Sequence, residues 1–177
     1  MKQTLAKSAA PQPASAQKEG KIAALDYGRR RIGLALAGTA SRIAQPCDTL
    51  ERINRNEDMR RLREFVRAHN VQQIVVGLPL RLDGTCGDMA EEATRFANRL
   101  RKEMRIPVIM IDERLTSWEA ERILEEELGR RITHETTRDG KRKQLRDAQG
   151  KYTVDAIAAM VILREYLSRE SETEEHA

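Results

Sequence analysis

The chain has 177 residues, a formal net charge of +4 at pH 7 and charged side chains at 34% of its positions. This length suffices for one ordinary domain with its own core, and it is too short for the two full lobes of a large two-lobed enzyme. No apolar stretch approaches the roughly 20 residues that cross a bilayer, and the N-terminal stretch lacks the apolar centre of a secretory signal, so we expect a soluble cytoplasmic protein without a membrane partner.

The first 50 residues predict a tail followed by three strands. Residues 1–20 are rich in Ala, Ser, Pro and Gln, which is typical of a disordered segment. Short apolar runs then cover 21–27, 31–38 and 42–50, separated by short turn-like stretches. This spacing predicts a three-stranded meander.

The middle of the chain alternates between helical and strand patterns. Apolar residues recur at helical spacing over 56–70, with Asn56 as the expected N-cap, and again over 88–104. Between these helices, "QQIVVGLPL" is the continuous apolar run of a strand buried on both faces, and "IPVIMID" (106–112) predicts a fifth strand. The resulting order βββαβαβ, followed by further helices, predicts an α/β fold with a mixed five-stranded sheet and helices on both faces.

The last third of the chain holds two more predicted helices around a basic segment. A capping-box pattern at Thr116 and Glu119 predicts a helix within 112–129. Residues 130–151 then carry eight Lys and Arg residues against three acidic ones, so we expect a basic flexible loop over 130–150. The final helix begins near residue 152. We thus expect one domain over 21–168, with 169–177 as a frayed acidic tail.

Three acidic residues follow apolar elements in a way that suggests chemistry. Strand alternation places Asp26 on the same face as Ile22 and Ala24, where an isolated carboxylate is costly unless it is paired or bound to a cation. The strand "IPVIMID" ends in Asp112 and is followed by Glu113, and alternation points these two acids to opposite faces. Asp155 lies in the first turn of the last helix. Each acid alone could be structural, for example Asp26 in a turn with an ion pair to a neighbouring arginine.

Taken together, these acids suggest a metal site. If the parallel strands bring Asp26 and Glu113 to one carboxyl edge, a helix across that edge could add Asp155 as a third oxygen ligand. Like charges this close need a cation, and Mg²⁺ or Mn²⁺ prefers carboxylate oxygen and water. Such ions can activate water against a phosphodiester, so hydrolysis of a nucleic-acid backbone is the reaction that fits.

Four motifs in the same order resemble the YqgF family, also called RuvX. They are "LDYGRRRIGLA", "VVGLPLRLDGT", "DERLTSWEAERIL" and "KYTVDAIAAMVIL". The resemblance implies an RNase H-like fold and a pre-16S rRNA nuclease or Holliday-junction-resolvase-like activity. It also implies that Asp26, Glu113 and Asp155 are the catalytic, metal-binding acids.

The resemblance further implies processing of the 5′ end of pre-16S ribosomal RNA, with branched DNA as a second candidate substrate. Among the other motif residues, Arg31 and Lys151 are expected to face substrate phosphates. In the basic loop, Arg142 and Lys143 are expected to grip the nucleic acid. We expect a monomer or a weak homodimer, and whether Asp112 contributes to the site stays open.

Two other functions stay open on the sequence. The first is a nucleic-acid-binding module in ribosome assembly or transcription, in which the acids are structural. The second is an actin-like or sugar-kinase-like phosphotransferase, since "DYGRRRIG" resembles the first phosphate-binding hairpin of that superfamily. The chain length and the absence of a second glycine-rich phosphate motif disfavour it. Cys47 and Cys86, far apart and without a CxxC pair, suggest neither a metal site nor a disulfide framework.

Overall fold

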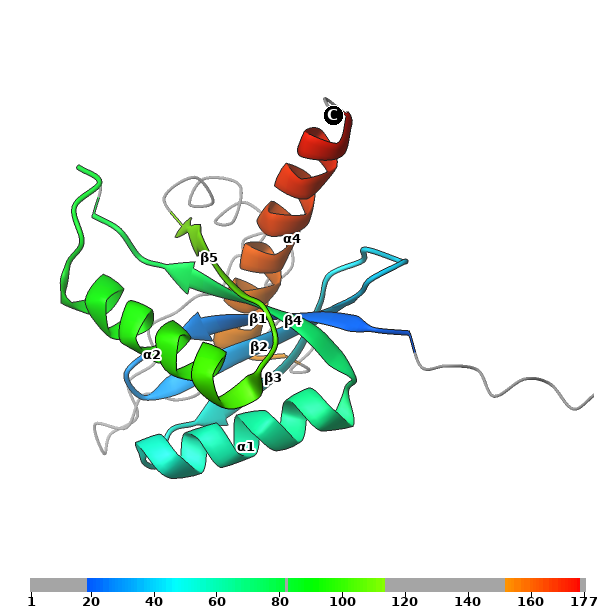
Figure 1. Cartoon of the computed structure of the whole chain (residues 1–177). Helices are drawn as coiled ribbons and strands as arrows, with labels where there is room; N and C mark the ends of the chain where they lie inside the picture. Colours follow the sequence, from blue (N-terminus) through cyan, green and yellow to red (C-terminus); the bar gives the residue numbers. More distant parts are fainter. Residues whose placement is uncertain (1–18, 82, 114–151, 176–177) are drawn as a thin grey trace, which may run out of the picture.

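The computed structural model describes residues 19–81, 83–113 and 152–175. In this part of the chain, five strands form one mixed sheet in the order β3-β2-β1-β4-β5 (Figure 1). The elements are β1 Lys21–Tyr27, β2 Arg31–Gly38, β3 Gln45–Glu51, α1 Arg55–Ala68, β4 Val71–Leu78, α2 Asp88–Met104, β5 Val108–Asp112 and α4 Val154–Glu175. The first three strands are an antiparallel meander, and β1, β4 and β5 run parallel. This confirms the predicted mixed five-stranded sheet.

The sheet separates two hydrophobic cores because alternate residues of each strand point to opposite faces. Helix α4 covers one face, and α1 and α2 cover the other (Figure 1). On the α4 face the sheet buries Ile22, Ala24, Ala35, Ala37, Val75 and Ile111. On the α1/α2 face it buries Ala23, Leu25, Ile32, Leu34, Ile74 and Val76. Asp26 and Tyr27, at the end of β1, therefore belong to opposite faces.

Helix α1 begins earlier than the sequence suggested. Its N-cap is Asn54 rather than the expected Asn56, because the Asn54 side chain accepts hydrogen bonds from the backbone N–H groups of Asn56 and Glu57 at 3.1 and 2.9 Å. Asn54 has the extended backbone of an N-cap, which leaves its side chain free to reach the first turn. The two asparagines could not be told apart by their type alone.

Helix α4 continues to Glu175, so the expectation of a frayed tail after residue 168 was wrong. Side chains of the last turns hold the helix together and attach it to the sheet. The Arg169 Nε lies 2.6 Å from the Glu165 Oε1, one turn apart, and Tyr166 donates to Glu170. Arg42, which follows β2, donates to the Leu167 carbonyl at 2.9 Å. These bonds give the polar end of the helix partners that composition did not reveal.

Several predicted segments lie outside the described residues. They are the tail up to residue 18, the helix expected after residue 113, the basic loop 130–150 and Lys151. Among the helices that the structure does describe, none is long and apolar enough to cross a membrane.

Candidate active site at the carboxyl end of the parallel strands

Asp26 lies at the end of the central strand β1, on the face that α4 covers. Its strand neighbours on this face, Ile22 and Ala24, are 5% and 0% exposed, so the carboxylate follows a fully apolar row. In the antiparallel pair, Asp26 lies opposite Gly33 of β2. The lack of a side chain at Gly33 lets another part of the chain approach the sheet backbone beside the carboxylate.

Glu113 follows β5 and reaches the same face across β4. Ile111, two residues earlier, is part of the core beneath α4, so the alternation puts Glu113 on that side and Asp112 on the other. A Cβ at Gly77 of β4 would lie 1.8 Å from the Glu113 Oε1, so the carboxylate lies directly over this glycine. Gly77 therefore makes the room in which Glu113 approaches β1.

The start of α4 brings the third acid to the same edge. A Cβ at Gly33 would lie 1.8 Å from the Asp155 carbonyl oxygen, so the first turn of the helix rests directly on the backbone of β2. The turn is also held by Thr153, whose hydroxyl accepts a hydrogen bond from the Ala156 N–H at 3.2 Å and bonds to the Thr49 hydroxyl of β3. The fold thus places Asp155 beside Asp26.

Burial and neighbouring carboxylates raise the pKa values of Asp26 and Glu113. Burial, and then the charge of Asp155, raise the pKa of Asp26 from 3.8 to about 6. Burial, and then the charges of Asp26 and Asp112, raise the pKa of Glu113 from 4.5 to about 7. Near neutral pH, the chain therefore holds partly buried anions whose charged forms are disfavoured by their surroundings.

Asp155 has a cationic partner at this edge. The Arg31 Nε lies 2.8 Å from the Asp155 Oδ2, and both side chains are less than a third exposed. Within the described part of the chain, no three His, Cys, Asp or Glu side chains are grouped closely enough to hold one ion among them. The structure thus places Glu113 where the charge of Asp26 acts on it, and it pairs Asp155 with Arg31.

The donor set suits a hard divalent cation. Asp26 and Glu113 offer only carboxylate oxygens, and burial is the largest cause of their raised pKa values. Mg²⁺ and Mn²⁺ bind one or two protein carboxylates and complete their coordination with water. Two carboxylates at one edge of the sheet therefore fit such an ion.

Sequence reasoning missed the residues that shape this site. Gly33 and Gly77 were visible in the motifs, but what each glycine makes room for depends on a residue far along the chain. Arg31, expected to meet phosphate, contacts Asp155 instead in this structure. Of the other expected phosphate contacts, Arg142, Lys143 and Lys151 lie outside the described residues.

Replacing Gly77 with alanine should move the Glu113 carboxylate away from Asp26. The added Cβ would meet side-chain ends, the Glu113 Oε1 and the Ile162 Cδ1, and these can move at a modest cost of about 1 kcal/mol. We expect the pKa of Glu113 to fall from about 7 toward its ordinary value of 4.5. A carboxyl-detected NMR titration would measure it, with Gly38→Ala in β2 as the control. An unchanged Glu113 pKa would contradict the position assigned to this carboxylate.

Comparison with known proteins places these observations among relatives. The family model described as RuvX, Holliday junction resolvase, matches residues 20–169. A protein named "Putative pre-16S rRNA nuclease" from Caldanaerobacter subterraneus is 36% identical over 147 residues, which cover 83% of this chain and 95% of that protein. Proteins of the same name from Koribacter versatilis and Syntrophus aciditrophicus are 39% and 40% identical, over 85% and 83% of this chain and 88% and 87% of their own lengths.

A solved structure shares the fold. Thermus thermophilus RuvC, determined in complex with a Holliday junction substrate, superposes with a TM-score of 0.50 at 12% identity, covering 86% of this chain and 96% of that one. At this identity the likeness shows the RNase H-like fold alone.

Proposed function

The chain belongs to the RuvX family, and on this premise we propose that it is a divalent-metal-dependent endonuclease of ribosomal RNA precursors. The catalytic unit in this proposal is residues 21–168, and it works in the cytoplasm, where we place its substrate. The observation that carries the proposal is the pair Asp26 and Glu113, two partly buried carboxylates with raised pKa values at the carboxyl edge of parallel strands.

We assign the cation to Asp26 and Glu113, with Asp155 as the third ligand. When bound, Mg²⁺ or Mn²⁺ would supply a polarised water and charge stabilisation for phosphodiester hydrolysis. The chain's own part is to fix the carboxylates: Gly77 admits Glu113, and Gly33 seats the helix that carries Asp155. The apolar rows beneath them exclude bulk water and strengthen each electrostatic interaction at the edge.

Arg31 has two roles in this proposal. Its guanidinium, 2.8 Å from the Asp155 carboxylate, neutralises that acid while no cation is bound. With Asp155 held as a cation ligand, the Arg31 guanidinium would be available to donate to a substrate phosphate, for which its planar pair of donors is suited. This assignment keeps the phosphate contact expected from the sequence and accounts for the ion pair that the structure shows.

The substrate assignment comes from the relatives. Those 36–40% identical to this chain are named for pre-16S rRNA, so we propose the 5′ end of that precursor as the substrate. Branched DNA is the second candidate, since the family description names the Holliday junction.

The alternative is a nucleic-acid-binding module without turnover. The Arg31–Asp155 ion pair favours it, because an acid with its own arginine can be purely structural. Such a module would bind RNA in a salt-dependent way and yield no metal-dependent product.

A cleavage assay with Glu113→Gln decides between these functions. We expect wild-type protein to shorten a pre-16S precursor with Mg²⁺ or Mn²⁺ and to stop in EDTA. Because Glu113→Gln removes one ligand charge and keeps the shape, we expect a loss of about 100-fold or more. Glu64→Gln, on the exposed face of α1, is the matched control and should cleave normally. Equal cleavage by both variants would remove Glu113 from the site, and no cleavage by wild type of RNA or branched DNA would favour the binding module.

A further inference from the structure

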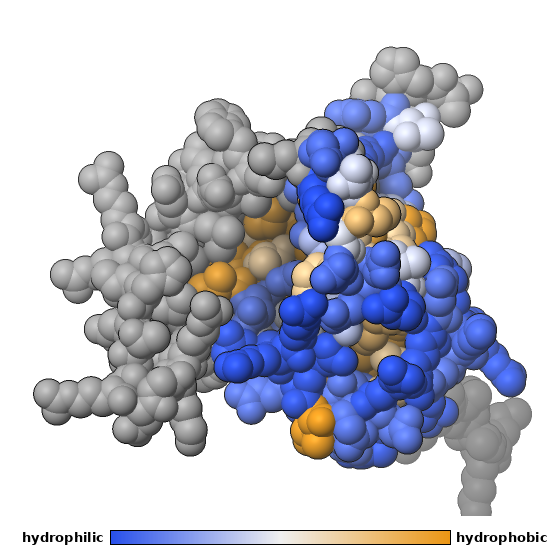
Figure 2. All heavy atoms as spheres, turned by 90° about the vertical axis from the view of Figure 1, so that its left-hand side faces the viewer, coloured by the Kyte–Doolittle hydropathy of each residue, from blue (hydrophilic) through white to orange (hydrophobic). Residues whose placement is uncertain are grey.

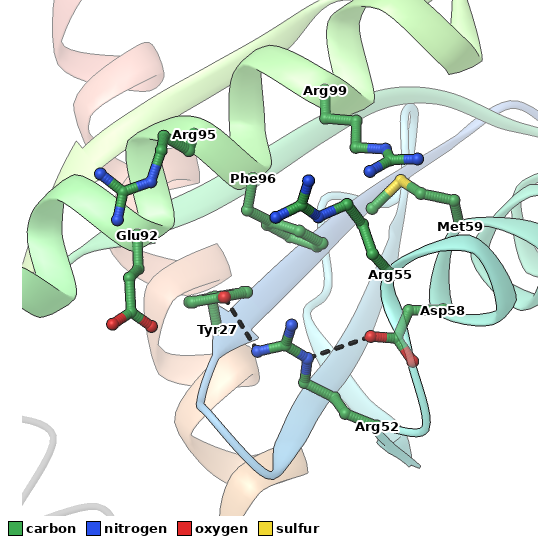
Figure 3. A pocket seen from close by; sticks show the side chains of 9 residues that line it. All are labelled: Tyr27, Arg52, Arg55, Asp58, Met59, Glu92, Arg95, Phe96 and Arg99. Atoms are coloured by element: carbon green, nitrogen blue, oxygen red, sulfur yellow. Dashed lines mark hydrogen bonds and ion pairs between the residues drawn. The ribbon is translucent and has the colours of Figure 1, made fainter.

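A second cavity lies on the face of the sheet opposite the carboxylates. It has a volume of about 390 Å³ and opens between α1, α2 and the end of β1. Its wall carries four arginines, Arg52, Arg55, Arg95 and Arg99, and Figure 3 shows their side chains arranged around Phe96 and Tyr27. Pockets of this size are large enough to hold a nucleotide-sized group.

The floor of this arginine pocket is a fixed network around Arg52. Its guanidinium donates to the Asp58 carboxylate at 3.1 Å, to the Tyr27 hydroxyl at 2.8 Å and to the Gly28 carbonyl at 3.0 Å (Figure 3). Asp58 is 2% exposed and also accepts from the Ile53 N–H at 3.0 Å. Asp58 therefore neutralises the Arg52 charge, and the hydrogen-bond network makes the floor of the pocket rigid.

Of the other three arginines, Arg99 is paired with Glu103 at 2.7 Å, whereas Arg55 and Arg95, on the rim, keep more of their charge available. Arg55 is exposed and has no hydrogen-bond or ionic partner among the described residues. Arg95 pairs with the Glu91 carboxylate at 3.4 Å, and both side chains are more than 60% exposed, so this pair contributes little. The acid on the rim, Glu92, is already neutralised by Arg29 at 2.9 Å. The rim thus presents a positive excess to solvent.

Helix stability does not explain Arg55. It is the first residue of α1, directly after the N-cap Asn54, where the helix dipole disfavours a positive charge. Arg55 lies at the N-terminus of the helix and lines a cavity together with other arginines. This position is suited to binding an anionic ligand. The same wall includes the Tyr27 and Phe96 rings, 4.6 Å apart between centroids. Proteins that bind single-stranded nucleic acid combine cationic and aromatic side chains in one groove.

The position of the pocket connects it to the carboxylates. Tyr27 directly follows Asp26, so the two residues mark opposite faces of one strand end. The turn between β1 and β2 lies beside this end and carries exposed arginines at 29 and 30. Figure 2 shows that the described surface on this side of the molecule is mostly hydrophilic, with small apolar areas among polar side chains. A strand that passes the carboxylates can therefore cross the turn and reach the rim.

We propose that the arginine pocket binds phosphate of a single-stranded RNA segment that flanks the scissile bond. The inference rests on the proposed nuclease function and adds to it a subsite away from the chemistry. It assigns Arg55 and Arg95 as phosphate-binding residues, with Arg52 as the residue that positions Tyr27 and the floor.

The test is binding of a labelled single-stranded RNA of about 12 nucleotides to the full chain in EDTA, followed by fluorescence anisotropy over a range of salt. We expect Arg55→Gln with Arg95→Gln to raise Kd about tenfold and to reduce the slope of log K against log salt by about 1.4, since two phosphate contacts are lost. Arg67→Gln with Lys102→Gln removes two exposed charges from the same two helices and should change neither value. Because Arg55 opposes the dipole of α1, its loss should not unfold the protein.

Equal effects of the two double variants, or no effect of either, would overturn the pocket as an RNA subsite. AMP as a competitor separates a strand site from a free-nucleotide site: displacement of RNA at micromolar AMP would also overturn it. These measurements need no turnover, so they fail independently of the nuclease proposal. If the pocket variants bind RNA normally while Glu113→Gln loses cleavage as expected, only the pocket proposal is wrong and the active-site proposal is supported.

Discussion

Asp26→Asn is expected to abolish metal-dependent cleavage and, in the same variant, to stabilise the metal-free fold. The loss of activity follows because Asp26 is the acid that interacts with both Glu113 and Asp155. A ligand worth several kcal/mol of charge stabilisation in the transition state corresponds to about 1000-fold in rate. Cleavage of the rRNA precursor under single-turnover conditions measures this loss.

The gain in stability follows from the sign of the Asp26 pKa change. Its pKa is higher in the folded chain, about 6, than its ordinary value of 3.8, so the folded state binds the proton more tightly. The tighter binding of this proton stabilises the folded state fully below pH 4, and this stabilisation is lost as the pH rises through 6. Above pH 7 the ionised carboxylate then costs about 2–3 kcal/mol of folding free energy, which a neutral amide avoids.

Urea unfolding in EDTA at pH 4.5 and pH 8 tests this pair of effects. The variant should be more stable than wild type at pH 8 and closer to it at pH 4.5, and added Mg²⁺ should stabilise wild type alone. Wild-type cleavage rates in the variant would remove Asp26 from the site. A variant that is less stable at pH 8 would show instead that the carboxylate is a structural partner, as in the binding-module alternative.

The architecture could be predicted from the sequence because the buried strands of the sheet have a recognisable pattern of apolar residues. Continuous apolar runs in 21–27 and 72–80 can only be interior strands, and the helical spacing in 88–104 matches α2 residue for residue. Chain ends and caps were predicted less well. Asn54 and Asn56 are equally good caps by type, and the last turns of α4 depend on Arg42, a residue more than 120 positions away.

For the candidate site, the sequence proposes a set of acids and says little about their arrangement. Alternation separated Asp112 and Glu113 onto opposite faces without saying which face each takes, and it is Ile111, in the core beneath α4, that puts Glu113 on that side. The Arg31–Asp155 pair and the arginine pocket both join residues distant in sequence, so no local pattern could reveal them. The basic residues after 130 attracted attention by composition, whereas the arginines of the pocket are dispersed over 52–99 and form a surface only in three dimensions.

Gly33→Ala is expected to have the largest effect on the fold of any small substitution near the site. The added Cβ would lie 1.8 Å from the Asp155 carbonyl oxygen, 2.3 Å from its carbonyl carbon and 3.1 Å from the Ala156 nitrogen. All three are backbone atoms in the first turn of α4, so no rotamer change can relieve the contact. The whole helix start must lift from β2, and it carries Ile157 and Met160 of the core with it.

Lifting the helix should cost about 3 kcal/mol of unfolding free energy, at the upper end of what overpacking costs. It also moves Asp155 away from Asp26, so cleavage should fall even in the folded fraction. Gly38→Ala in the same strand is the matched control, because its added Cβ meets only the ends of the Glu19 and Ser41 side chains. Urea unfolding of both variants gives the comparison. A Gly33→Ala variant as stable as Gly38→Ala would mean that α4 does not rest on β2, and the third acid would then lose the support that places it at the edge of the sheet.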